Sequence, residues 1–288
     1  MRMTKRTLAT ISWLTVLLWL TLPTWAITGD EVLDRMRDAF SFGDDGDGIL
    51  LSIDIENEYA NGTVTSYRLA VVADAATVET EGQDPYEITQ VLMYFLGGDD
   101  EGMIFLLHLP ELREIASQMW LYIAAFDLTK ELITDRDQAG RFAGSTFTYG
   151  DIAGARELRD EYHAELLREE VMNVGSEERA VWVIQLTPRE TDDAEYARVV
   201  LWVDQEAEQF LRLEGYDAER QLVKEILVTE LGTFEQRRVA ETMIGRDTLT
   251  GDVSTLRMYD MRRPEMPLPI ELFQPESLAG FDVDAYGF

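Results

Sequence analysis

The chain has 288 residues, a formal net charge of −30 and no cysteine. Its 55 acidic residues outnumber its 25 basic ones, so its surface repels both phosphate backbones and anionic lipid head groups, which argues against nucleic acid as a partner. Without cysteine it can form no disulfide and carry no lipobox lipid anchor. The acidic excess is typical of a solvated surface, or of adaptation to a salty medium, and by itself indicates no site.

The first 26 residues have the order of a secretory signal peptide. A basic stretch, MRMTKR, precedes an apolar run from Leu8 to Leu22, and the small residues Thr24 and Ala26 stand where a signal peptidase cleaves. The run is too short, and too rich in Thr and Ser, for a bilayer span of about 20 apolar residues. The sequence predicts cleavage after Ala26, export to the periplasm, and a single soluble domain over residues 27–288.

Helical patterns are few. Thr28 and Glu31 form a capping box, and apolar residues then repeat at helical spacing, so a helix is predicted over residues 29–40. Two further helices are predicted over Asp84–Leu96 and Asp151–Tyr162. No strand–helix–strand alternation is present, which argues against a doubly wound nucleotide-binding fold.

From Ile49 onward most of the chain has the pattern of β-strands. About ten segments of strand length, mostly alternating apolar and polar residues, are separated by short turns such as Asn61-Gly62. They include ILLSIDIENEY, TVTSYRLAVVA, MIFLLHL, MWLYIAAF, AVWVIQLT, YARVVLWVD and LVKEILVTEL. The pattern predicts a mainly antiparallel β protein with a few helices, built as a sandwich or a barrel.

Residues that could carry chemistry are sparse. Neither His108 nor His163 has a second His or Cys at ligand spacing, and Ser145 lies in AGSTF rather than in G-x-S-x-G. The acidic turn that begins at Asp45 resembles a calcium loop, but Ile49 stands where that loop needs a ligand. We therefore expect no enzyme activity, no cofactor and no metal requirement.

Three strand segments are apolar on both faces. Trp120 and Tyr122 share one face of their segment, and the residues between and beside them are apolar too; the segments around Trp182 and Trp202 repeat this pattern. Strands of this kind need cover on both sides. Either one side packs against helices while the other lines an apolar cavity, or the strands belong to a thick ordinary core.

Residues 141–152, RFAGSTFTYGDI, place three large aromatics among small residues. Phe147 and Tyr149 are two apart, so they point the same way in an extended chain. Phe142 shares that face only if Gly144 permits a bulge or a bend. This stretch, adjacent to a strand that is apolar on both faces, is a candidate for the mouth of an apolar cavity.

The stretch from Trp120 to Asp151 resembles a segment of the LolA-like outer-membrane lipoprotein-sorting proteins. There a W-L-Y-x-P strand precedes a basic turn and then F-x-G-S-D-F-T-Y-x-D-L. The matching residues here are Phe142, Gly144, Ser145, Phe147, Thr148, Tyr149 and Asp151. YARVVLWVD, LRLEGYDAERQLVKEI and PIELFQPESL resemble later parts of the family, so the resemblance spans residues 100–280. The chain departs from the pattern at Ala124, Glu131, Thr146 and Gly150.

The resemblance implies an α+β fold, a half-open antiparallel β-barrel wrapped around helices, with an apolar cavity that shelters acyl chains in the periplasm. It implies lipid acyl chains or lipoproteins as partners and no catalysis. An alternative is a non-catalytic periplasmic subunit that docks on an inner-membrane exporter of the RND type without carrying lipid. The residues expected at the cavity are Phe142, Phe147 and Tyr149 near its mouth, and Trp120, Tyr122, Trp182 and Trp202 deeper inside.

Overall fold

A computed structural model describes residues 27–39, 48–79, 84–98, 100–110, 115–133, 140–153, 158, 162–189 and 195–288. The predicted signal peptide and the acidic turn at Asp45 lie outside these residues. Within the described part of the chain, no helix is both long and apolar enough to cross a bilayer.

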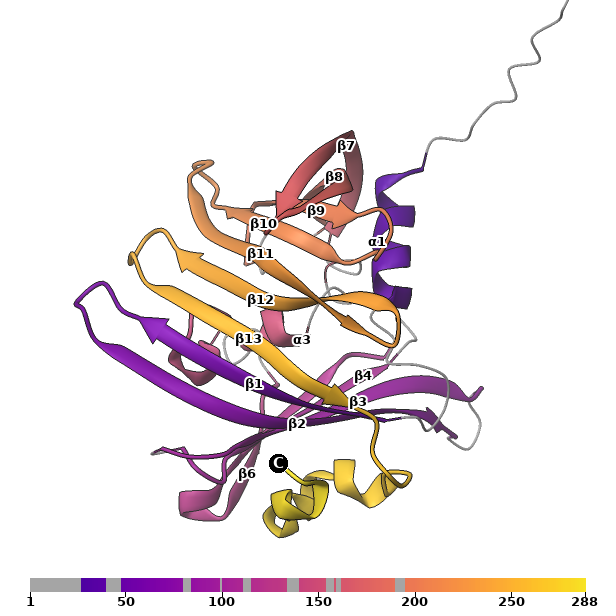
Figure 1. The fold of residues 1–288 in the computed structure, drawn as a ribbon, viewed down its shortest axis with the longest axis vertical. Coiled ribbons are helices and arrows are strands. Elements are labelled where there is room, and N and C mark those ends of the chain that lie inside the picture. The colour runs from indigo at the N-terminus through magenta and orange to yellow at the C-terminus, as the bar shows by residue number, and fades with distance from the viewer. Residues whose placement is uncertain are drawn as a thin grey trace, which may run out of the picture.

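One antiparallel sheet dominates the fold, with thirteen strands in the described residues, and it is strongly curved (Figure 1). The strands are β1 (Ile49–Glu58), β2 (Val64–Val78), β3 (Tyr86–Phe95), β4 (Ile104–Pro110), β5 (Gln118–Ile123), β6 (Leu128–Glu131), β7 (Tyr162–Val174), β8 (Glu177–Pro188), β9 (Arg198–Asp204), β10 (Phe210–Tyr216), β11 (Leu222–Phe234), β12 (Arg237–Asp247) and β13 (Val253–Arg262). The order across the sheet is β6-β5-β4-β3-β2-β1-β13-β12-β11-β10-β9-β8-β7. Two meanders are thus joined where β1 pairs with β13, which leaves β6 and β7 as the two edges. The predicted mainly antiparallel β fold is confirmed.

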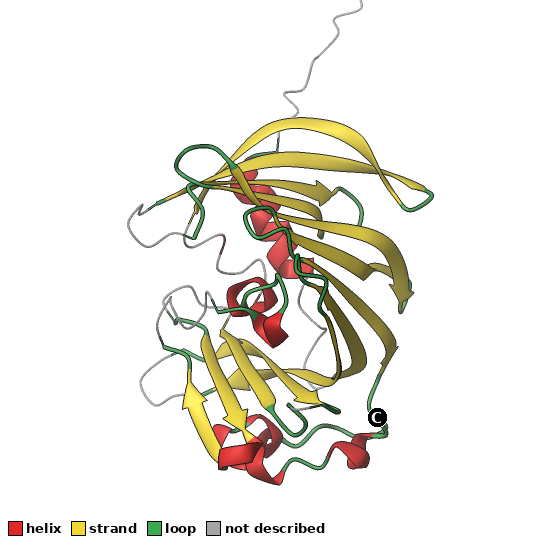
Figure 2. Cartoon of the chain, turned by 90° about the vertical axis from the view of Figure 1, so that its left-hand side faces the viewer, coloured by secondary structure: helices red, strands yellow, loops and turns green. Residues whose placement is uncertain are grey.

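The helix α1 (Gly29–Ala39) begins where the sequence predicts. The backbone N–H of Glu31 donates to Thr28 Oγ1 at 3.2 Å, and the N–H of Thr28 donates to the Glu31 carboxylate at 2.7 Å, so the capping box is formed. Val32, Leu33 and Met36 are buried in the same cluster as residues of β7 and β8. α1 and the short α3 (Tyr149–Ala153) lie on the same side of the curved sheet (Figure 2).

The helix predicted over Asp84–Leu96 is wrong, because this segment forms β3, paired with β2 and β4. Val91, Leu92 and Met93 are all buried, since both faces of β3 are covered. A strand buried on both faces loses the alternation that distinguishes it from a helix. The helix predicted over Asp151–Tyr162 is also corrected: α3 begins earlier, at Tyr149, and Tyr162 begins β7.

Buried apolar residues form three clusters. The inner cluster lies on the α1 side and includes Leu33, Ile55, Leu69, Phe95, Phe105, Met119, Trp182, Leu201 and Ile226. The C-terminal cluster lies on the opposite face of β3, β4 and β5 and includes Leu50, Val72, Leu92, Ile104, Leu106, Tyr122, Phe273 and Leu278. The third cluster, named the hairpin cluster, lies on β7 to β11, away from the β5–β6 hairpin. It includes Val174, Val181, Val183, Val200, Trp202, Leu211 and Val228. Side chains of one strand alternate between clusters, so the prediction that these strands need cover on both sides is confirmed.

The C-terminal segment after β13 covers the outer face of β3, β4 and β5 with three 3₁₀ turns, η3 (Ile270–Phe273), η4 (Pro275–Gly280) and η5 (Val283–Tyr286). Arg262 donates from Nη2 to the carbonyl oxygens of Tyr286 at 2.9 Å and Gly287 at 3.1 Å. The ring of Tyr94 on β3 meets that of Phe281 at a centroid distance of 5.5 Å. This segment therefore supplies the cover that the outer faces of these strands require.

His108 links β4 to this segment and predicts a pH-dependent stability. Its Nε2 lies 2.8 Å from the Phe273 carbonyl oxygen and 3.2 Å from Nε2 of Gln90. Burial lowers the pKa of His108, and the hydrogen bond to Phe273 only partly opposes this. In the unfolded chain the pKa is ordinary, about 6.5. The unfolded chain therefore binds the proton first as the pH falls, and stability is lost between that value and the lower pKa of the folded state.

We expect the melting temperature to fall less for His108→Gln than for the unaltered chain when the pH is lowered from about 7 to about 5. The glutamine keeps a donor near the Phe273 carbonyl but carries no titratable group. All carboxyl groups are common to both proteins, so their contribution cancels in the comparison. Parallel pH curves for the two proteins would contradict this role of His108.

Candidate functional site

Residues 141–148 form a compact loop on the inner side of the sheet. The backbone N–H of Phe142 donates to the carbonyl of Phe147 at 2.8 Å, and a 3₁₀ turn, η2 (Phe142–Gly144), bends the chain between them. Gly144 has a φ of +66°, and a Cβ there would lie 2.7 Å from the hydroxyl of Tyr59. Glycine therefore fits both the left-handed backbone and the close approach, and the bend expected at Gly144 is present.

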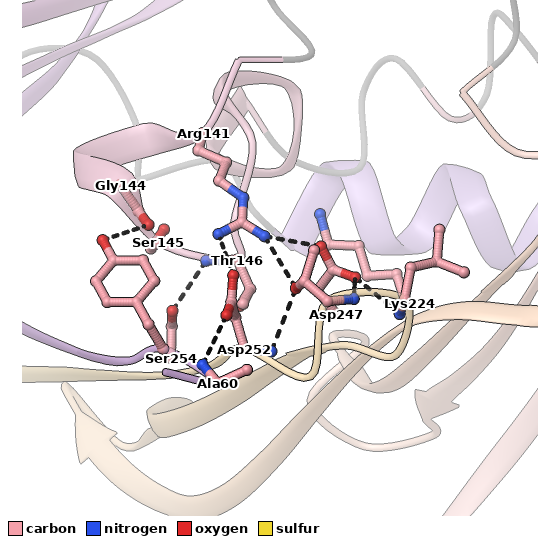
Figure 3. Close-up of polar contacts among 12 residues, drawn as sticks. Ala60, Arg141, Gly144, Ser145, Thr146, Lys224, Asp247, Asp252 and Ser254 are labelled. Carbon is pink, nitrogen blue, oxygen red and sulfur yellow. Dashed lines mark hydrogen bonds and ion pairs between the residues drawn. The ribbon is translucent and has the colours of Figure 1, made fainter. Parts of the chain in front are cut away.

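Polar groups of β1, of Tyr59 directly after it and of β13 hold the loop in place (Figure 3). Tyr59 donates its hydroxyl to the carbonyl of Gly144 at 3.0 Å, and the backbone N–H of Thr146 donates to Ser254 Oγ at 2.9 Å. Ser254 in turn donates its hydroxyl to Oδ1 of Asn57 at 2.8 Å. The amide nitrogen of Asn57 donates to the carbonyl of Ala143 at 2.9 Å. The loop thus rests on the strands that join the two halves of the sheet.

Arg141 clamps the start of the loop to the β12–β13 turn (Figure 3). Its guanidinium donates to Asp252 at 2.7 Å and to Asp247 at 2.8 Å. Two hydrogen bonds hold the pKa of Asp252 below its usual range. The larger effect comes from the backbone N–H of Ala60 and the next from the Arg141 guanidinium. The clamp therefore joins three segments that are far apart in the sequence.

The aromatic side chains of the loop pack into the inner cluster. Phe142 and Phe147 are only 1% and 2% exposed. The Phe142 ring lies 5.6 Å from that of Phe105 on β4 and 5.6 Å from that of Tyr149, measured between centroids. Tyr149 and Phe105 are 5.1 Å apart. Pairs at such distances are attractive beyond their buried area, so the loop is fastened by aromatic contacts as well as by hydrogen bonds.

Gly245 on β12 makes room for the loop. A Cβ at this position would lie 2.4 Å from Thr146 Oγ1 and 3.1 Å from Phe147 Cζ. Gly245 belongs to a cross-strand row on the inner face, between Ser254 of β13 and Ile226 of β11. The hydroxyl of Thr146 is buried there and has no hydrogen-bond partner among the described residues. The glycine lets the loop lie directly on the backbone of the sheet.

A buried ion pair fixes α3 to the sheet. Thr148 and Asp151 cap the helix reciprocally, with the N–H of Thr148 donating to the carboxylate at 2.6 Å and the N–H of Asp151 donating to Thr148 Oγ1 at 3.0 Å. The Asp151 carboxylate also pairs with the ammonium group of Lys224 on β11, which is only 6% exposed.

In the described part of the chain, no group of three or more His, Asp or Glu side chains is placed to hold a metal ion.

The inner cluster is rich in methionine. Of the protein's 11 methionines, seven belong to it or pack against it: Met36, Met93, Met103, Met119, Met243, Met258 and Met261. Methionine side chains are unbranched and polarizable, so they adapt to ligands of irregular shape. This face of the sheet is therefore both apolar and adaptable.

The structure divides the seven predicted cavity residues among three places. Phe142, Phe147, Tyr149 and Trp182 belong to the inner cluster or pack against it. Trp120 and Tyr122 lie across the sheet in the C-terminal cluster, and Trp202 lies in the hairpin cluster. These last three are therefore not deeper parts of the site that contains the loop. A ligand-binding role stays a prediction for each of the seven.

Several residues of the site were not singled out by the sequence. Lys224 occupies an inward position two residues before Ile226 of the inner cluster, and a charged residue on an apolar face could have been noticed as a buried ion-pair partner. Arg141 and Gly245 gave no such indication. Their partners lie about a hundred residues away in the chain.

Comparison with known proteins places this arrangement in a family. Residues 87–279 match the model of a family whose description reads "uncharacterized protein". A DUF1329 family protein from Desulfovibrio piger has a similar structure, with a TM-score of 0.70 and 21% identity over 87% of this chain and 97% of that chain. The match over residues 87–279 places the chain in the uncharacterized family, and the solved structure shows the fold.

Two further structures share the LolA-like fold. A protein domain from Vibrio parahaemolyticus, named for outer-membrane lipoprotein sorting, has a TM-score of 0.67 and 22% identity over 87% of this chain and 98% of that chain. A LolA superfamily protein from Nitrosomonas europaea has a TM-score of 0.59 and 21% identity over 86% of this chain and 98% of that chain. No curated protein matches the sequence. The LolA-like fold implied by the resemblance over residues 100–280 is thus confirmed.

Proposed function

We propose that this LolA-like protein is a periplasmic carrier that binds the acyl chains of lipids or lipoproteins against the inner face of its sheet. In this proposal the curved sheet acts as a half-open barrel around α1 and α3. Residues 1–26 are a signal peptide removed after Ala26, and residues 27–288 are a single lipid-binding domain. The protein needs no metal or cofactor and catalyses no reaction.

The methionine-rich inner cluster carries this proposal. It extends from α1 across both halves of the sheet and includes the loop with Phe142 and Phe147. A chain of methylene groups gains about 0.8 kcal/mol for each group transferred from water to such a surface. Flexible methionine side chains can move aside for it without leaving polar groups unpaired.

Two further observations support a non-catalytic carrier. Ser145 Oγ accepts a hydrogen bond from the backbone N–H of Phe147 at 3.1 Å. His108 lies on the other side of the sheet, in the C-terminal cluster. His108 is therefore not placed to activate Ser145. The Vibrio parahaemolyticus relative, which shares the fold, is named for lipoprotein sorting.

Binding of a homologous series of fluorescent fatty-acyl probes tests the proposal. We expect affinity to rise with chain length by up to about fourfold for each added methylene, the factor that corresponds to about 0.8 kcal/mol. Titration of the purified protein by probe fluorescence measures this slope. An affinity that does not depend on chain length, or no binding of any probe, would contradict the proposal.

Native mass spectrometry addresses the alternative, an accessory subunit of an inner-membrane exporter. A carrier should retain a lipid from the cells that produce it, and the bound mass should disappear after delipidation. An accessory subunit that carries no lipid should show only the mass of the chain, and it should bind none of the acyl probes.

A further inference from the structure

The hairpin that joins β5 to β6 exposes large apolar side chains. Phe126 and Leu128 are 77% and 52% exposed, and Ile133, two residues after β6, is 73% exposed. The hairpin lies at one edge of the sheet, since β6 pairs only with β5 among the described strands (Figure 1). Three large apolar side chains within eight residues are costly to leave in water, and such patches commonly mark interaction sites.

One face of the hairpin continues the inner cluster outward. Met119 and Leu132 are buried in that cluster, and Leu121, the next residue on the same face, packs against it. Beyond Leu121, Ile123 pairs directly with the exposed Leu128. On β5 the apolar side chains thus run from the core to the tip of the hairpin, while Lys130 of β6 lies opposite Leu121.

The tip is held rigidly. A 3₁₀ turn, η1 (Ala124–Phe126), is closed by Asp127 in the left-handed region, with φ of +47°, whose N–H donates to the carbonyl of Ala124 at 3.2 Å. The hydroxyl of Tyr122, a buried residue of the C-terminal cluster, donates to the Asp127 carboxylate at 3.0 Å. The backbone that carries Phe126 is therefore held by these bonds, so the turn needs little rearrangement when a partner binds.

The charges around the hairpin limit which kind of partner can bind it. The hairpin has two acidic residues, Asp127 and Glu131, and one basic residue, Lys130. The β3–β4 turn adds Asp100 and Glu101, and it reaches Ala124, since a Cβ on Gly102 would lie 3.1 Å from that of Ala124. A second copy of the chain brings the same acidic groups, and the whole protein has a charge of −30. An anionic membrane is repelled for the same reason. A protein surface rich in Lys and Arg is attracted.

We propose that the β5–β6 hairpin is a docking surface for a partner protein that offers an apolar groove flanked by Lys or Arg. The groove receives Phe126 and Leu128, and the basic groups pair with the acidic residues around the tip. The proposal goes beyond acyl-chain binding and does not depend on it, because a chain that binds no acyl probe can still dock through this hairpin.

Photo-crosslinking from the tip tests the proposal in the cells that produce the full chain. p-Benzoylphenylalanine replaces Phe126 in one variant and Leu249, which is 71% exposed on the β12–β13 turn, in a matched control. We expect an adduct with one other protein from position 126 and none from position 249. The captured protein is identified by mass spectrometry, purified and titrated with the unaltered chain.

In that titration, the double variant F126S/L128S should bind the captured protein at least tenfold more weakly, while Leu249→Ser should bind as the unaltered chain does. Both replaced side chains are exposed, so the melting temperature should not change. Added salt should also weaken binding of the unaltered chain. No adduct at position 126, an adduct with a second copy, equal capture from position 249, or unchanged affinity of the double variant would each overturn the proposal. Flotation of the protein with phosphatidylcholine or phosphatidylglycerol vesicles, lost in F126S/L128S, would also overturn it in favour of a membrane.

Discussion

Replacing Asp151 by Asn should lower the free energy of unfolding by about 3–5 kcal/mol, because the buried side chain of Lys224 loses the carboxylate with which it forms an ion pair. Lys224 is 6% exposed and the side chain of Asp151 is 11% exposed, so water cannot replace the lost carboxylate. The substitution also removes the charge that caps α3 at the N–H of Thr148. Both losses act on the helix that follows the aromatic loop.

Urea unfolding measures this effect, and two further variants define its origin. Adding Lys224→Met to the Asp151→Asn chain should restore most of the lost stability, because the buried charge is then gone. Glu208→Gln, which removes one partner of the exposed pair with Arg35, should cost at most about 1 kcal/mol. A loss of that small size for Asp151→Asn, or no recovery in the double variant, would show that the buried pair does not hold α3.

Phe147→Ala and Phe273→Ala should each lower the free energy of unfolding by about 3–5 kcal/mol, since each removes a buried aromatic ring and leaves a cavity. The two residues are matched: they are 2% and 1% exposed, in the inner and the C-terminal cluster. They lie on opposite sides of the sheet, so only Phe147 can contact a ligand on the inner face. We therefore expect only Phe147→Ala to change the affinity for a fluorescent fatty-acyl probe.

Stability and affinity must be measured separately for this pair, with affinity taken at a temperature where both variants remain folded. Probe binding that is weakened to the same extent in both variants would indicate a general loss of structure. Unchanged probe binding in Phe147→Ala, together with a large fall in melting temperature, would assign the loop RFAGSTFTYGDI to the core alone. A selective loss of affinity in Phe147→Ala would place the ligand against the inner cluster.

Local interactions explain which elements were predictable. The capping box of Thr28 and Glu31 is complete within four residues, so the start of α1 could be read directly. The turns between strands are equally local, and they predicted an antiparallel sheet. β3 was mistaken for a helix because its apolar run has no clear period, and only pairing with β2 and β4 selects the strand.

The candidate site was predictable only in part. The motif from Phe142 to Asp151 identified the loop and its aromatic residues. The partners that hold the loop were not identified from the sequence. Asp247 and Asp252, which pair with Arg141, lie 106 and 111 residues further along the chain and approach the loop only when β12 and β13 have joined the sheet. Likewise, nothing near Gly245 in the sequence indicates that Thr146 and Phe147 will lie on it.

A largely antiparallel β structure with strands that are apolar on both faces could be inferred from the amino-acid sequence, because turns and the side chains of each strand are local features of the chain. The sequence also determined the LolA-like motif around Phe147. Which face of each strand lies inside and which lies outside depends on contacts between distant segments. Trp120 and Tyr122 lie outside because the C-terminal segment covers that side, whereas Trp182 lies inside because α1 does. Those covers come from opposite ends of the chain, and no strand carries information about which distant segment will pack on it.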